Sequence, residues 1–81
     1  MLSRTVSCAL AEGTLAEGLE AVQKRYPDIE IGSYPYLRAK QYGVSLVLRG
    51  TDESLLEEAA EAVATLVREL GGEPEVTAGT T

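Results

Sequence analysis

Two kinds of hydrophobic repeat alternate along the chain, and their order is the strongest limit on the folds that it can adopt. Apolar residues alternate with polar ones over residues 4–10, 28–33 and 44–49, which is the period of a half-buried strand. Apolar residues recur at every third or fourth position over residues 14–26 and 52–70, which is the period of an amphipathic helix. The sequence therefore predicts the order strand, helix, strand, strand, helix.

This order is met most economically by an α+β domain in which both helices cover one face of a three- or four-stranded antiparallel sheet. The arrangement is ferredoxin-like or KH-like, β-α-β-β-α with an optional last strand. We expect a single domain over residues 1–72, followed over residues 73–81 by a short edge strand near 75–77 and a flexible tail. The expected shared core comprises Val6, Leu10, Leu19, Ile31, Leu46, Leu48, Val63 and Leu66.

The first helix has recognisable end signals. Thr14 and Glu17 have the spacing of a capping box, so we expect the helix to begin at Thr14. Pro27 should end it, because the residue before a proline is disfavoured in helical conformation. Gly18 lies on the apolar stripe, and its missing side chain should let the helix sit close to a sheet.

The sequence also predicts where the second helix begins and ends, and what kind of segment precedes the third strand. Thr51 or Asp52 is the expected N-cap, and Gly71 with Gly72 should stop the helix. Between the second and third strands, residues 34–43 are expected to form a long connecting loop.

Several chemistries lack the residues that they need. The chain contains no His and a single cysteine, so the common zinc sites and Ser-His or Cys-His nucleophile pairs are excluded. Cys8 alternates inward on the first strand and should be a buried structural thiol. We therefore expect no catalytic, metal or cofactor-binding residue. One cysteine and the lack of a signal-like or membrane-length apolar segment favour a cytoplasmic location.

Nucleic acid and membrane are not expected partners. The net charge is -6, and phosphate binding depends mainly on Lys and Arg. No two of the eight glycines are three positions apart, so the GxxG clamp of KH domains is absent. The expected open face of the sheet has no aromatic residue on which a base could stack. It comprises Thr5, Ser7, Ala9, Glu30, Ser45, Val47 and Arg49.

One segment has the composition of a contact surface. Residues 34–42 contain three of the four tyrosines and two of the seven basic residues, and Tyr and Arg are frequent anchors of protein interfaces. The alternative is that the segment only closes a hairpin and covers the edge of the core. The candidate interaction residues are Tyr34, Tyr36, Arg38, Lys40 and Tyr42.

The same region carries a family resemblance. Residues 31–36 read Ile-Gly-Ser-Tyr-Pro-Tyr, and residues 43–52 read Gly-Val-Ser-Leu-Val-Leu-Arg-Gly-Thr-Asp. This pattern resembles the domain that follows the molybdopterin-binding-like domain in CinA-type competence/damage-inducible proteins, and a similar segment occurs in eukaryotic FAD synthases. The resemblance implies an accessory domain, sometimes described as KH-like, next to domains that carry the nucleotide or cofactor chemistry.

These observations lead to one main hypothesis and two alternatives. The main hypothesis is a non-catalytic interaction domain that packs on a neighbouring domain of its parent protein or on a second subunit. The first alternative is a regulatory module that binds a small molecule. The second is a fragment that contributes Arg38, Lys40 or a tyrosine to a nucleotide- or cofactor-processing site completed by other domains.

Overall fold

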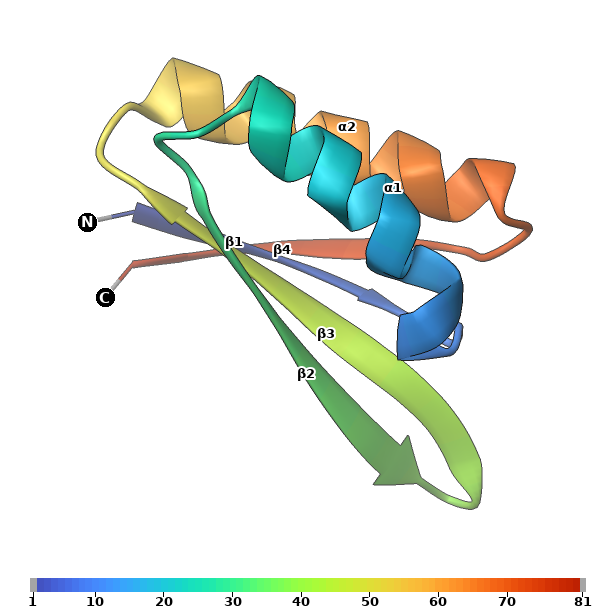
Figure 1. Ribbon diagram of the computed structural model, residues 1–81. Coiled ribbons are helices and arrows are strands. Elements are labelled where there is room, and N and C mark those ends of the chain that lie inside the picture. The colour runs from blue at the N-terminus through green and yellow to red at the C-terminus, as the bar shows by residue number, and fades with distance from the viewer. Residues whose placement is uncertain (1, 81) are drawn as a thin grey trace.

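A computed structural model describes residues 2–80, and the four strands form one antiparallel sheet in the order β2-β3-β1-β4 (Figure 1). The central pair is β1 with β3, and β2 and β4 are the two edges. The elements are β1 (Leu2–Cys8), α1 (Glu12–Arg25), β2 (Glu30–Arg38), β3 (Gln41–Gly50), α2 (Glu53–Glu69) and β4 (Glu75–Thr80). The predicted α+β fold, with two helices and an antiparallel sheet, is confirmed.

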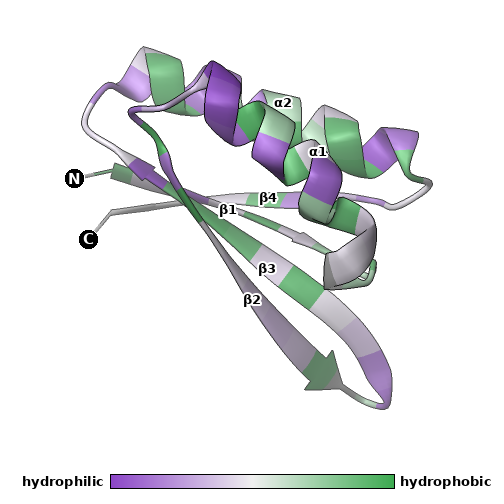
Figure 2. Cartoon of the chain, viewed as in Figure 1, coloured by the Kyte–Doolittle hydropathy of each residue, from purple (hydrophilic) through white to green (hydrophobic). Residues whose placement is uncertain are grey.

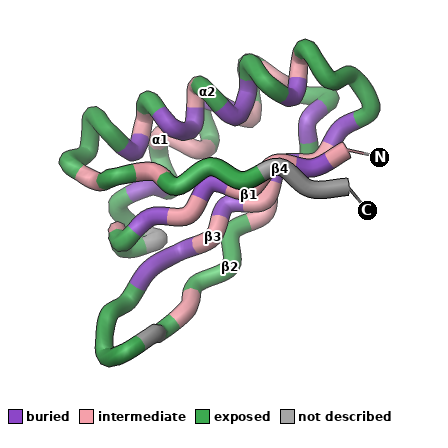
Figure 3. Tube along the Cα trace, turned by 180° about the vertical axis from the view of Figure 1, so that it is seen from behind, coloured by how far each residue is buried: buried purple, intermediate pink, exposed green. Residues whose placement is uncertain are grey.

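Both helices lie on one face of the sheet, and the core is the layer between them and the strands (Figures 1 and 3). Leu46 and Leu48 of β3 and Val63 of α2 are fully buried. Val6 is also fully buried, and the other four predicted core residues are partly buried against this cluster. Hydrophobic positions of α2 recur along the helix (Figure 2) and place six residues in the buried layer. They are Leu56, Ala59, Ala60, Val63, Ala64 and Val67.

A charged contact joins α2 to the central strand at one side of this layer. The Nε of Arg4 donates to Oε1 of Glu57 at 2.6 Å, and the Arg4 side chain is only 13% exposed. The long apolar stem of Arg4 can therefore lie along the core while its head group meets a carboxylate at the helix surface.

The first helix begins earlier than the sequence predicted. It starts at Glu12 after Ala11, whose backbone is extended, and no side chain caps it. The N–H of Thr14 donates to the carbonyl of Ala11 at 3.0 Å, so Thr14 already lies in the first turn and the capping box is wrong. Gly18 also differs from expectation, because a Cβ there would meet the side chain of Leu66 on α2 rather than the sheet.

The second helix has both of its predicted end signals. Asp52 is the N-cap, and its carboxylate accepts the N–H of Leu55 at 3.1 Å. At the other end Gly71 has φ +88°. The N–H of Gly71 donates to Arg68 and that of Gly72 to Val67 at 3.0 and 2.9 Å, the two bonds of a Schellman motif.

Gly71→Ala should lower the free energy of unfolding by about 1 kcal/mol, because an L side chain is disfavoured at positive φ. Nothing lies within 4 Å of a Cβ at this position, so the cost is conformational rather than steric. Urea unfolding followed by circular dichroism measures it. The matched control is Gly13→Ala, which also has open space around its Cβ but lies inside α1 with negative φ and should stabilise. Equal effects of the two changes would contradict this account.

Residues 34–43 do not form the long loop that the sequence predicted. Strand β2 continues to Arg38, β3 begins at Gln41, and their pairing is continuous from Glu30 opposite Arg49 to Arg38 opposite Gln41. A two-residue turn, Ala39-Lys40, joins them with φ 47° and 67°. Two positive φ values in a two-residue hairpin are those of a type I′ turn. The ribbon formed by β2 and β3 extends beyond the helices (Figure 1).

The last strand is present and longer than expected. It was predicted over residues 75–77, but β4 runs from Glu75 to Thr80 and pairs with β1 from Ser7 to Leu2. Residues 78–80, which were assigned to the tail, therefore have strand backbone, and Thr81 lies outside the described residues. The pairing explains the extension, because each added residue meets an unpaired edge of β1.

Candidate interaction surface

The face of the sheet opposite the helices is not covered by any other described element (Figure 1). Because directly opposite residues of an antiparallel pair share one face, the strand register defines its members. They are Glu30, Gly32, Tyr34, Tyr36 and, by its backbone position, Arg38 of β2, Gln41, Gly43, Ser45, Val47 and Arg49 of β3, Ser3, Thr5 and Ser7 of β1, and Glu75, Thr77 and, by its backbone position, Gly79 of β4. We call this set the open face.

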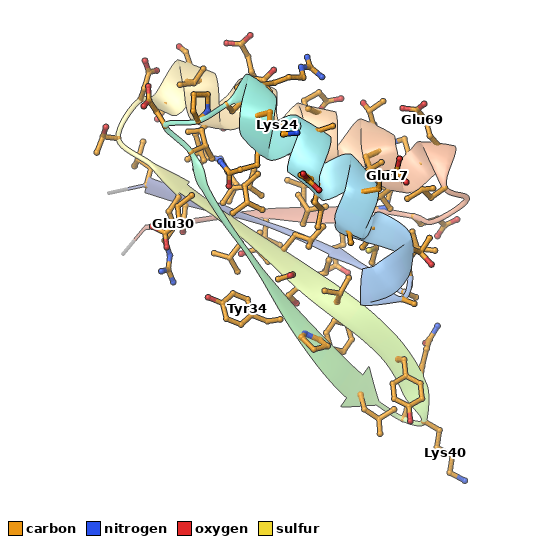
Figure 4. All side chains as sticks on the ribbon, viewed as in Figure 1. Glu17, Lys24, Glu30, Tyr34, Lys40 and Glu69 are labelled. Carbon is orange, nitrogen blue, oxygen red and sulfur yellow. The ribbon has the colours of Figure 1, made fainter. Side chains whose placement is uncertain are left out.

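The open face contains aromatic residues, which corrects the sequence prediction that it has none. Tyr34 and Tyr36 lie on it opposite Ser45 and Gly43, and Figure 4 shows Tyr34 on the side of β2 away from the helices. The sequence analysis ended the second strand at Ser33, and it therefore placed both tyrosines in a loop with no assigned face.

The two rings lie over glycines. The hydroxyl of Tyr34 would be 3.1 Å from a Cβ at Gly32, and Cζ of Tyr36 would be 2.5 Å from a Cβ at Gly43. An aromatic ring that covers a glycine in a strand replaces the packing that the missing side chain cannot supply. Tyr36 is half-buried and thus belongs partly to the fold, whereas Tyr34 is 53% exposed and available for contact.

The structure does not bring the five predicted interaction residues together on one surface. Tyr42 pairs with Leu37, and both lie on the other side of the ribbon from Tyr34 and Tyr36. They are 75% and 57% exposed. Lys40 is in the turn at the tip of the ribbon (Figure 4). Arg38 is the last residue of β2, and only its backbone is described.

The open face also carries a pair of adjacent opposite charges that the sequence analysis did not identify as a candidate site. Glu30 and Arg49 are direct cross-strand neighbours. Among the described side chains, neither makes an ion pair. The Nε of Arg49 is covered and has no hydrogen-bond partner among the described residues. Both residues were assigned to this face, but only the strand register shows that they are adjacent.

One cleft among the described residues lies at the end of α1 and has charged side chains in its lining, Lys24, Asp28 and Glu30. This cleft has a volume of about 710 Å³ and lies between the end of α1 and the start of β2. The side-chain amide of Gln23, which lines this cleft, donates from Nε2 to the backbone carbonyls of Tyr26 and Ile29 at 3.1 and 2.7 Å. Within residues 2–80, no three His, Cys, Asp or Glu side chains are placed to hold a metal ion. Cys8 is buried and unpaired, as predicted.

No helix within the described part of the chain is long and apolar enough to cross a membrane.

Solved structures with similar architecture establish the fold. The designed protein Foldit4 is 19% identical with a TM-score of 0.77, covering 99% of this chain and 96% of that one. A designed protein with a ferredoxin fold, LFR1 1, is 14% identical with a TM-score of 0.68, covering 99% and 85%. A C-terminal segment of the alpha subunit of aIF2 from Pyrococcus abyssi is 21% identical with a TM-score of 0.55, covering 98% and 51%. The fold is therefore ferredoxin-like.

The comparison of sequences identifies the family. No curated protein matches the chain. The family described as "FAD synthase, middle domain" matches residues 1–72, which span β1 to the end of α2 and include the ribbon with its Gly-Ser-Tyr-Pro segment. The chain belongs to the family of FAD synthase middle domains.

Proposed function

We propose that the chain is a non-catalytic interaction domain of a parent protein of FAD synthase or CinA type, and that it contacts a neighbouring domain or subunit through its open face. The observation that carries this proposal is the open face itself. Tyr34, Val47 and Arg49 lie on it beside small hydroxyl residues, and no described element covers them. Tyrosine and arginine are among the residues that are enriched at protein interfaces and that contribute most to binding there.

The lack of His and of an accessible Cys supports the non-catalytic part of the proposal. The chain has no His, and its one cysteine is buried. Lys40 lies in the turn at the tip of the ribbon, and Tyr42 and Tyr34 lie on its two opposite sides, so these three residues do not form a processing site within this chain alone. In the cleft at the end of α1, the side-chain amide of Gln23 donates its hydrogen bonds to backbone carbonyls of the chain itself. A domain of this kind acts by contact.

The contact can be mapped by NMR on the labelled chain mixed with the neighbouring domain of its parent protein. Amide signals of Gly32, Tyr34, Val47 and Arg49 should shift, and those of the exposed side of α2 should not. Tyr34→Ala should weaken the binding at least about tenfold, as expected for an aromatic anchor worth more than ~1.4 kcal/mol. Tyr42→Ala, on the other side of the ribbon, is the matched control. Shifts confined to α2 or to Tyr42 would contradict the proposal.

The regulatory alternative is tested by thermal shift with FAD, ATP and a mixture of amino acids. An interaction domain should keep its Tm within about 1 °C with each probe. A ligand present at about 100 times its Kd would add ~2.7 kcal/mol to the stability of a regulatory module, which in a domain of this size raises Tm by more than about 10 °C. A gain of that size with any probe would replace the interaction hypothesis.

A further inference from the structure

The adjacent charges on the open face are arranged so that a second copy of the same face would complement them. Glu30 and Arg49 are cross-strand neighbours of opposite charge, and neither makes an ion pair with a described side chain. A two-fold axis places the same patch of two copies together, so that residue i of one copy contacts residue j of the other and the reverse. A neighbouring positive and negative group can satisfy this condition with two contacts at once.

Charge elsewhere on the chain favours the same face. The sequences of α1 and α2 contain eight acidic residues against three basic ones. Two copies meeting through their helices would bring acidic surfaces together, which costs free energy. The open face holds Arg49 against Glu30 and Glu75 among its described side chains, with hydroxyl and aromatic residues around them. Two copies with a net charge of -6 can approach with least repulsion through this side.

We propose that two copies of the chain pack open face to open face about a two-fold axis that runs parallel to β2 and β3, midway between them. Glu30 of each copy then lies against Arg49 of the other. This inference rests on the proposed function, because it names the occupant of the same contact surface as a second copy.

The same axis gives an apolar contact beside the two ion pairs. Val47 is the cross-strand neighbour of Gly32, and the ring of Tyr34 lies over Gly32. The axis brings position 32 of one copy against position 47 of the other. The Tyr34 ring of each copy therefore packs on Val47 of its mate, and each half-buried valine becomes covered on its exposed side. Aromatic and β-branched side chains pack favourably in this way.

The size of the face sets the expected affinity. About this axis only the ribbon of β2 and β3 faces the mate, and two strands of 9 and 10 residues about 4.8 Å apart present about 300 Å² per copy. That is below the roughly 800 Å² per partner of a standard stable interface. We expect a reversible dimer with a dissociation constant on the order of 10–1,000 μM.

Sedimentation equilibrium of the wild-type chain at concentrations up to about 1 mM tests the association. The charge contacts are tested by exchanging them. Arg49→Glu gives a chain with two carboxylates at this place, and Glu30→Arg gives one with two guanidinium groups. Each variant alone should lose at least about tenfold in affinity, because like charges then meet across the axis. An equimolar mixture of the two should restore dimerisation, since every contact becomes one of opposite charge.

Two further measurements test whether the dimer forms through the open face, one on the wild-type chain and one on a control variant. On dilution of the wild-type chain, amide signals of Glu30, Val47 and Arg49 should move while those of α2 stay fixed, which needs no variant. Tyr42→Ser, on the other side of the ribbon, should leave the dissociation constant unchanged. A wild-type chain that stays monomeric at about 1 mM, a mixture that fails to restore the dimer while both variants remain folded, or dilution shifts on α2 would each overturn the inference. If the chain is monomeric but its open face shifts with the neighbouring domain, the proposed function stands and only the second copy is excluded.

Discussion

Leu46→Asp should prevent the chain from folding. Leu46 has no exposed surface and lies in β3 at the centre of the core. An unpaired carboxylate in an apolar layer costs several kcal/mol, to which the lost leucine packing adds ~2–5 kcal/mol. A domain of 81 residues has a total stability of roughly 4–12 kcal/mol. The amide spectrum of the variant should therefore collapse to the narrow dispersion of an unfolded chain.

The neighbouring residue provides the control for this experiment. Val47 follows Leu46 in β3 but lies on the open face and is only partly buried. Val47→Asp should leave the chain folded, with a loss of about 1 kcal/mol from strand propensity and a weaker dimer. A dispersed spectrum for Leu46→Asp, or unfolding by both changes, would mean that the strand does not divide its side chains between core and open face.

Replacing Ala39-Lys40 with Asn-Gly should raise the free energy of unfolding by about 1–2 kcal/mol. Both residues have positive φ, a conformation that costs an L residue roughly 1–2 kcal/mol and that Asn and Gly adopt readily. Urea unfolding measures the gain. If residues 34–43 formed a wide loop instead, the added glycine would increase the conformational entropy of the unfolded chain and the variant would lose stability. The sign of the change therefore distinguishes the continuous hairpin from the loop.

The β-α-β-β-α order, the packing of both helices on one face of the sheet, and most of the core could be predicted from the sequence. Each depends on the spacing at which hydrophobic residues repeat along one strand or one helix. Val44, Leu46 and Leu48 occupy every second position, and in a strand this puts all three on one face. The end of the second helix was predictable for a similar reason, since Gly71 supplies a positive φ that few other residues tolerate.

The extent of the ribbon could not be read from the sequence. Gly32 and Pro35 disfavour strand structure locally, and Ala39-Lys40 lacks the residues that usually mark a type I′ turn. In the fold, β2 is an edge strand, where proline is tolerated because one side of the backbone needs no partner. Tyr34 and Tyr36 cover the glycines that weakened the pattern. Pairing with β3 thus extends a segment whose own propensity would end it.

For the candidate site, too, the sequence identified the residues and the structure decided their arrangement. The sequence identified residues 34–42 as rich in tyrosine and basic residues, and composition alone was enough for that. Which of them share a surface depends on the strand register, which assigns Tyr34 to the open face and Tyr42 to the opposite side. The register also places Glu30 beside Arg49, residues that are 19 positions apart in the chain. Sequence periodicity determines which residues each strand turns inward, but only pairing between strands decides which outward residues are neighbours, because that depends on where the turn falls.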